Sequence, residues 1–303
     1  MAIETDEFSY LPHQAQALDV PLPAVRRRTL ALPDGRSLSA LQYGTGDPVV
    51  TLLHGAGLNA HTWDTTALML GVPALAIDLA GHGDSSWRED LDYTAHPLSR
   101  DVIAALEAWT TTPQILVGQS LGGLTAAAVA ARRPELARSL VIVDITPGID
   151  TSAGPAALRD FYAGPTDFAD RDELVERALS FGFGGERAAT ERGVFLNTRV
   201  REDGRIEWKH HFAHLAARTL GIDGAQTAAR PSPEAGWEDL AEVTAPIALI
   251  RASAGFVSEA DGAEFLQRLP DAELTVMTAS HNVQETAPAD LAELIRTRIA
   301  AAR

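Results

Sequence analysis

The stretch LVGQSLGG, residues 116–123, places a single serine among glycines and apolar residues. Residues 115–117 are typical of a short buried strand, and residues 124–131 are typical of the start of a helix. Ser120 therefore lies on the turn between them, in a Gly-X-Ser-X-Gly pattern. Small flanking residues let a strand and a helix approach closely while the serine takes a strained conformation and presents its hydroxyl at the top of a sheet. The stretch predicts an α/β fold with a candidate nucleophile.

Short apolar segments recur on both sides of this turn. PVVTLLHG, PALAIDLAG and SLVIVDITP each resemble a buried strand, and segments with helical spacing alternate with them. Such alternation predicts a mostly parallel sheet with helices on both faces. Residues 25–32 and 37–43, separated by Pro33-Asp34-Gly35, predict an antiparallel hairpin before that sheet. The alternation resumes near residue 246 with two more strands, each followed by a helix.

The alternation stops between residues 148 and 238. This segment contains amphipathic stretches such as FADRDELVERALSF, interrupted by glycines, and it predicts a helical lid inserted after the strand that ends at Asp144. The expected organisation is an N-terminal surface arm at 1–24, a core at 25–147 and 239–303, and a lid, or cap, at 148–238.

Composition narrows the possible partners. The 303 residues contain 25 Lys and Arg against 41 Asp and Glu, a formal charge of −16, which disfavours nucleic acid and anionic membranes as partners. The absence of cysteine excludes disulfides, thiolate catalysis and cysteine-ligated metals. The acidic N-terminus does not resemble a signal peptide, and no stretch is apolar enough to span a membrane, so a cytoplasmic location is expected. The sequence leaves the oligomeric state open, and a homo-oligomer is one option.

Polar residues follow several of the predicted strands. His54, Asp78, Ser120, Asp144 and His281 each come at or just past a strand end. Catalytic groups in parallel α/β sheets gather at this edge. The order serine, acid, histidine along the chain is that of the α/β-hydrolase triad.

From about residue 25 to the C-terminus the sequence resembles the α/β-hydrolase fold family, serine esterase and lactonase branch. LLHGAG is similar to the family's oxyanion loop, IDLAGHGDS to the segment after the next strand, GQSLGG to the nucleophile elbow and TASHNVQETAP to the histidine loop. The resemblance implies that Ser120 attacks an acyl carbon, that His281 removes its proton and that an acid orients His281. It also implies that the backbone N–H groups of Ala56 and Leu121 form the oxyanion hole, and that no cofactor or metal is needed.

The triad acid departs from the commonest pattern of the family. In most members it follows the strand after the lid, but here that loop reads RASAGFVSEAD, with Gly255 near the expected position. Asp144 is the favoured candidate, because it follows the strand directly after the nucleophile helix. Glu259 and Asp261 stay open as alternatives, although both fall where a helix N-terminus would favour an acidic side chain.

The expected function is hydrolysis of a small-molecule carboxylic ester or lactone through an acyl-enzyme. Lid aromatics indicate a fairly large apolar substrate, although some of them could form the core of the lid itself. The candidate pocket residues are Phe161, Phe183, Trp208 and Phe212. The alternatives are carbon–carbon bond hydrolysis of a diketone, perhydrolysis, and a non-catalytic ligand receptor on the same fold.

Three lid histidines raise the question of a metal site. His210, His211 and His214 lack an HExxH pattern and a carboxylate partner. We therefore interpret them as lid-surface or pocket-lining residues, and no metal is predicted.

Overall fold

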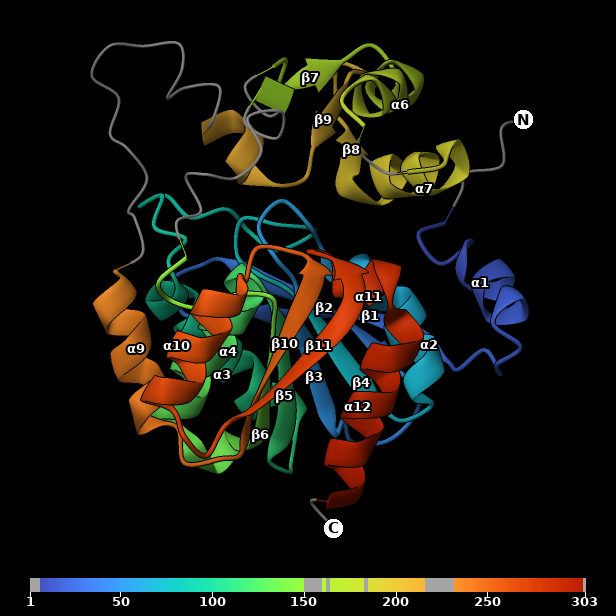
Figure 1. The fold of residues 1–303 in the computed structure, drawn as a ribbon. Helices are drawn as coiled ribbons and strands as arrows, with labels where there is room; N and C mark the ends of the chain where they lie inside the picture. The colour runs from blue at the N-terminus through green and yellow to red at the C-terminus, as the bar shows by residue number, and fades with distance from the viewer. Residues whose placement is uncertain (1–5, 150–159, 162–163, 183–184, 216–231, 302–303) are drawn as a thin grey trace.

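The computed structural model describes residues 6–149, 160–161, 164–182, 185–215 and 232–301. Its centre is an eight-stranded sheet with the order β1-β2-β4-β3-β5-β6-β10-β11 (Figure 1). The strands are β1 (Val25–Ala31), β2 (Ser37–Tyr43), β3 (Val50–Leu53), β4 (Ala74–Asp78), β5 (Gln114–Gln119), β6 (Ala137–Val143), β10 (Ile247–Ala254) and β11 (Glu273–Ser280). Strand β2 runs antiparallel to β1 and β4, and all other neighbours are parallel.

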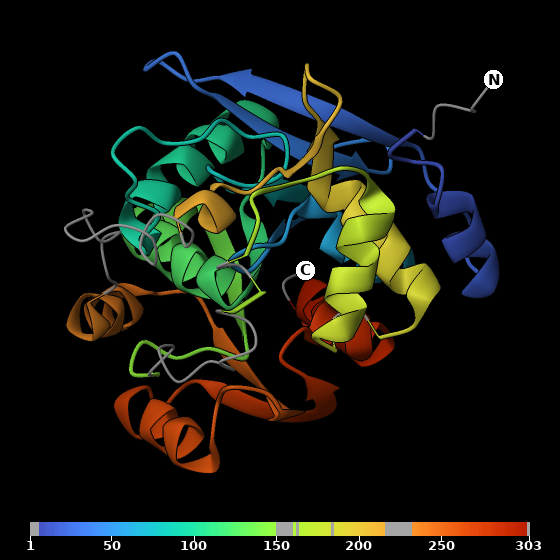
Figure 2. The same ribbon diagram turned by 90° about the horizontal axis from the view of Figure 1, so that it is seen from above.

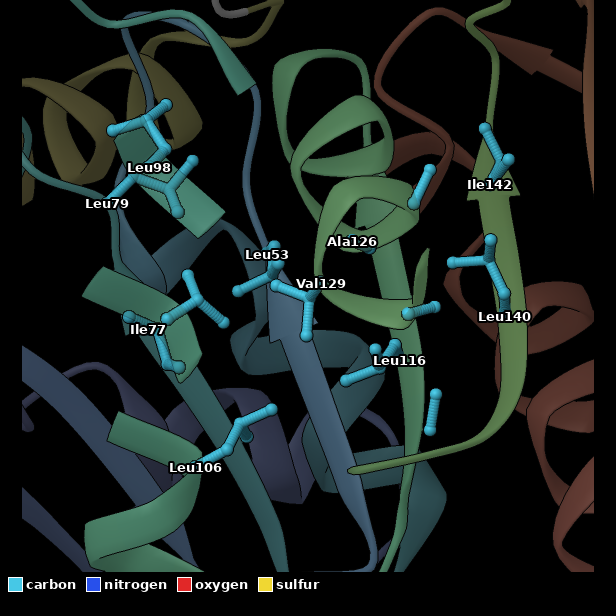
Figure 3. Close-up of a cluster of buried hydrophobic side chains, with 14 of the residues drawn as sticks. Leu53, Ile77, Leu79, Leu98, Leu106, Leu116, Ala126, Val129, Leu140 and Ile142 are labelled. Carbon is cyan, nitrogen blue, oxygen red and sulfur yellow. The ribbon is translucent and has the colours of Figure 1, made fainter. Parts of the chain in front are cut away.

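Helices cover both faces of this sheet. One face packs against α3 (Ala95–Trp109), α4 (Leu121–Arg132), α9 (Pro233–Glu242) and α10 (Glu259–Arg268). The other packs against the short helix η1 (Ala60–Trp63), α2 (Asp64–Leu70), α11 (Val283–Thr286) and α12 (Pro288–Ala301). A further short helix, η2 (Pro134–Leu136), leads into β6. Figure 3 shows the first of these cores, where Leu53, Leu116 and Leu140 from three adjacent strands meet Val129 of α4.

Consecutive residues of the central strands enter opposite cores. Leu116 of β5 lies in the first core, whereas Ile115 and Val117 lie in the second, and all three are essentially inaccessible to solvent. A strand buried on both faces has no position for an exposed polar side chain. This explains why these strands are continuous apolar runs, and the predicted α/β-hydrolase fold is confirmed.

The described part of the insertion between β6 and α9 lies over one end of the sheet (Figure 1). It contains the helices α6 (Arg171–Ser180) and α7 (Arg187–Asn197), and also a three-stranded antiparallel sheet, which the expectation of a helical lid did not include. These strands are β7 (Asp167–Phe168), β8 (Thr198–Val200) and β9 (Ile206–Trp208). At two or three residues each, they are too short for an alternating pattern to be read from the sequence.

The sequence predicts that the insertion ends at residue 238. Residue 238 falls inside α9, and Leu240 of that helix is buried in the first core of the sheet. Helix α9 therefore packs with the core through Trp237 and Leu240.

The N-terminal arm contains a helix that its composition did not predict, α1 (Leu11–Ala17). Leu11 and Ala15 are buried against Leu68 of α2, so one face of this short helix is anchored on the core. Just before it, the ring of Tyr10 lies 5.7 Å from that of Phe195 in the lid helix α7. Seen from above, α1 lies next to α7 (Figure 2).

Candidate active site

Ser120 occupies the turn between β5 and α4 in a strained conformation, with φ 52° and ψ −121°. Residues other than glycine rarely adopt this backbone conformation, so the surrounding contacts have to hold Ser120 in it. A Cβ on Gly118 would lie 2.1 Å from the carbonyl oxygen of Gly122, and a Cβ on Gly122 would lie 2.2 Å from that of Leu53. Both glycines are therefore required for the close approach of strand and helix that fixes Ser120.

Asp144 follows β6 directly and is fully buried. Its backbone is also in the left-handed region, at φ 52°. The carboxylate accepts backbone N–H bonds from Ala252 of β10 at 3.0 Å, and from Phe256 at 2.7 Å and Val257 at 3.4 Å in the loop that follows this strand. These donors satisfy a carboxylate that would otherwise be costly to bury.

His281 is held against this carboxylate. Its Nδ1 lies 2.7 Å from Oδ2 of Asp144, and its ring stacks on Phe256 with the centroids 3.7 Å apart. The side-chain amide of Gln119, the residue before Ser120, donates to the carbonyl of His281 at 3.3 Å. The histidine loop is thereby fastened next to the elbow. The structure joins Asp144 directly to His281, whereas between the side chains of Ser120 and His281, both of them described, it records no hydrogen bond.

The surroundings of Gly255 account for the unusual place of the acid. A Cβ at this position would lie 2.0 Å from Oδ2 of Asp144. The carboxylate of Asp144 thus fills the volume that a side chain at residue 255 would need. The two alternative acids lie elsewhere: Asp261 caps α10 through Ser258, and Glu259 is 91% exposed and pairs with Arg251 at 3.5 Å.

The loop after β3 contains the predicted oxyanion donor Ala56. His54 Nε2 accepts the N–H of Leu79 at 3.0 Å, so the ring proton lies on Nδ1, which donates to the carbonyl of Gly55 at 2.8 Å. A Cβ on Gly55 would lie 3.2 Å from Cβ of Ser120, so this loop touches the elbow. For the N–H groups of Ala56 and Leu121, no acceptor is recorded among the residues that the structure describes.

Burial keeps several histidines around this loop neutral. It lowers the pKa of His54 to about 4, and burial together with the neighbouring His54 lowers the pKa of His82 to about 3. The ring centroids of this pair are 5.0 Å apart. His210, from the lid, is also fully buried, and burial lowers its pKa well below the ordinary value.

The predicted lid residues have different surroundings. Phe161 and Trp208 are buried in the lid's own apolar cluster, with ring centroids 5.7 Å apart, which favours the lid-core alternative for both. Phe212 is 42% exposed, and Phe183 lies outside the described residues.

Two of the three lid histidines are not surface residues, and His214 is half-buried. His210 and His211 are buried, and His211 stacks on Trp87 with centroids 4.3 Å apart. No cluster of three or more metal-ligating side chains occurs within the described ranges. Likewise, none of the described helices is long and apolar enough to cross a membrane.

Two residues that hold the site were not predicted. Phe256 supports both His281 and Asp144, and Gln119 fastens the histidine loop. Gln119 belongs to the quoted serine motif, but nothing in the spacing indicates that its amide reaches a loop more than 160 residues away.

Comparison with known proteins agrees with this geometry. Residues 52–294 match the model of the alpha/beta hydrolase family, and the chain belongs to that family. It is 35% identical to the esterase Rv0045c of Mycobacterium tuberculosis over 96% of this chain and 95% of that protein. A solved structure of that esterase superposes with a TM-score of 0.83 at 33% identity, covering 98% of this chain and 99% of the other. The chain is also 26% identical to the mouse sn-1-specific diacylglycerol lipase ABHD11, over 84% and 81% of the two chains. The predicted esterase branch of the family is confirmed.

Proposed function

We propose that this protein hydrolyses a carboxylic ester or lactone of a small molecule through an acyl-enzyme on Ser120. The observation that carries the proposal is the buried Asp144–His281 pair, 2.7 Å apart and fastened beside the strained serine elbow. The esterase activity of the Mycobacterium relative supports the same bond class.

The proposal gives each group a role. The carboxylate of Asp144 accepts a hydrogen bond from the N–H at Nδ1 of His281. This leaves Nε2 of His281 as the base that removes the proton of the Ser120 hydroxyl. The serine oxygen attacks the acyl carbon, and the oxyanion is stabilised by the N–H groups of Ala56 and Leu121. His281 then protonates the leaving alkoxide and activates the water that releases the acid.

Two further features bear on the substrate. Phe161 and Trp208 belong to the lid's own packing, so they do not support a large apolar pocket. The described residues offer Phe212, which is 42% exposed, as the remaining candidate for contact with a substrate.

The test is steady-state hydrolysis of aryl esters of increasing acyl length and of several lactones, with wild type and Ser120→Ala compared. We expect multiple turnovers in wild type and a loss of about 10³-fold or more in the variant. A fluorophosphonate probe should add its mass to wild type but not to Ser120→Ala. Labelling without ester turnover would favour the carbon–carbon hydrolase alternative, and neither labelling nor turnover would favour the receptor.

A further inference from the structure

The lid helix α7 contacts the loop that contains Ala56. At the C-terminus of this helix, Asn197 donates from Nδ2 to the carbonyl oxygen of Gly57 at 2.7 Å. The amide orientation is set by a second contact, because Asn59 Nδ2 donates to Oδ1 of Asn197 at 3.1 Å. Asn59 also donates to the carbonyl of Leu196 at 3.1 Å. The loop and the helix end are therefore connected by three hydrogen bonds.

These contacts matter because of their position around Ala56. The N–H of Ala56 shares a peptide plane with the carbonyl of Gly55, which His54 holds from the core. The carbonyl of Gly57, two peptide units further along the chain, is held by Asn197 from the lid. Gly57 has a φ of 77°, which only glycine adopts readily, so the loop has little intrinsic preference for this conformation. With an anchor on each side of Ala56, the intervening peptide units have less freedom to rotate, and this restricts the direction of the Ala56 N–H.

Helix α7 is itself fixed to the core at its other contacts. Arg192 binds the buried carboxylate of Asp64 and donates to the carbonyl of His61 at 3.1 Å. At the end of the helix, the carbonyl of Asn197 accepts the N–H of Lys209, which follows β9 in the lid sheet. The side chain of Asn197 is thus presented from a helix whose middle is bound to the core through Arg192 and whose C-terminal end is bound to the lid sheet.

We propose that Asn197 is a positioning residue of the oxyanion hole, so that the lid directs the Ala56 N–H through the carbonyl of Gly57. The proposal rests on the proposed function, in which Ala56 supplies one of the two oxyanion donors. Its consequence is that displacement of α7 disorganises the oxyanion hole as well as uncovering the site.

The test compares Asn197→Asp with wild type, because aspartate keeps the shape and the contact from Asn59 but cannot donate to Gly57. Asn197→Ala removes both contacts. Glu191→Ala, an exposed change on the same helix, is the matched control. The first readout is amide hydrogen exchange in residues 54–59, which we expect to become about tenfold faster or more in both Asn197 variants and to stay unchanged in the control.

The second readout is kinetic. A misplacement of about 1 Å in a catalytic group can cost about 10²-fold, so kcat for an aryl ester should fall about 10- to 100-fold, with KM changed little. Affinity for a trifluoromethyl ketone, which forms a tetrahedral oxyanion on the serine, should fall by the same factor. Fluorophosphonate labelling gives the fraction of competent sites, so kcat is expressed per labelled serine.

The outcomes separate the two proposals. Unchanged exchange in Asn197→Asp and Asn197→Ala overturns the positioning role, whatever the activity. Faster exchange with unchanged kcat and ketone affinity overturns the link between the lid and the oxyanion hole while leaving the serine mechanism intact. If wild type shows no Ser120-dependent turnover, the proposed function fails instead, and exchange still decides whether Asn197 holds the loop.

Discussion

The substitution Gly255→Ala tests the assignment of Asp144 with the smallest possible change. A Cβ on residue 255 would lie 2.0 Å from Oδ2 and 2.4 Å from Cγ of Asp144. Ordinary contact begins at 3.4 Å, so the carboxylate has to move by about 1.4 Å, the difference between 3.4 and 2.0 Å. The displaced oxygen is the one that lies 2.7 Å from Nδ1 of His281, so the pair is broken.

The magnitude follows from the role of the acid. Loss of the correctly oriented histidine costs about 10⁴-fold in kcat in serine hydrolases, and a misplacement near 1 Å costs about 10²-fold. We therefore expect Gly255→Ala to lower kcat by about 10²- to 10⁴-fold, and the overpacked loop to lose roughly 1–3 kcal/mol of unfolding free energy. The assays are aryl-ester hydrolysis and urea unfolding. Asp261→Asn is the control. This substitution alters the capping box at the start of α10, so it should lower the unfolding free energy by about 1 kcal/mol and leave kcat nearly unchanged.

A rescue completes the test. In Asp144→Gly with Gly255→Asp, the carboxylate starts from the Cβ that points into the same volume, and glycine at residue 144 accepts its φ of 52° without strain. We expect the double variant to exceed Asp144→Gly alone by about tenfold or more in kcat, because the acid again orients His281. Wild-type activity in Gly255→Ala would refute the argument.

Three further predictions concern stability. Burial lowers the pKa of His82 from 6.5 to about 3, so between these pH values the unfolded chain binds one more proton at this residue than the folded chain. The contribution of His82 to the unfolding free energy should therefore fall by about 1.4 kcal/mol per pH unit below pH 6.5, and His82→Gln should remove this part of the slope in urea titrations. Burial alone would raise the pKa of Glu7, but hydrogen bonds from the side chains of His61 and Arg27 outweigh the effect of burial and lower the pKa to about 2. The stability that Glu7 contributes is therefore complete above pH 4.5 and is lost toward pH 2, so the deficit of Glu7→Gln should be smaller at pH 3 than at pH 7. Gly122→Ala forces a Cβ to 2.2 Å from the carbonyl oxygen of Leu53, so it should lower the unfolding free energy by roughly 1–3 kcal/mol and remove most of the activity. A Cβ on Gly193 meets nothing within 4 Å, so Gly193→Ala should raise the unfolding free energy by about 0.5–1 kcal/mol through a more stable α7. Thermal unfolding measures both changes.

The core of the fold could be predicted because its strands are buried on both faces. The hairpin predicted at 25–32 and 37–43 corresponds to β1 and β2, and the apolar runs correspond to the central parallel strands. The lid could be predicted only as an interruption of the strand and helix alternation. Strands such as β7, with two residues, are stabilised by contacts with β9 and by the lid's apolar cluster, not by a local pattern.

The site could be predicted where a chemical group has to follow a strand. The candidate residues Ser120, Asp144 and His281 follow from this rule, since each stands next to a strand end. Phe256 and Asn197 could not be found, because their contacts join segments far apart in the sequence: Phe256 stacks on His281, and Asn197 bonds to Gly57 across 140 positions. Phenylalanine and asparagine are not chemically reactive, so no catalytic motif marks these two positions in the sequence.

The position of the acid shows what the fold requires of the sequence. Strands β6 and β10 are parallel neighbours, with Val143 paired to Ile250, so both end at the same edge of the sheet. The main chain of Asp144 continues this pairing by donating to the carbonyl of Ile250 at 2.8 Å. A carboxylate that starts from residue 144 therefore reaches the volume facing residue 255, and the two positions cannot both carry a side chain there. In the proposed mechanism His281 requires one carboxylate in that volume, and by this geometry either strand end could supply it, provided that the residue at the other is small. An aspartate after β6 and a glycine after β10 are therefore one feature of this sequence, although 111 positions separate them.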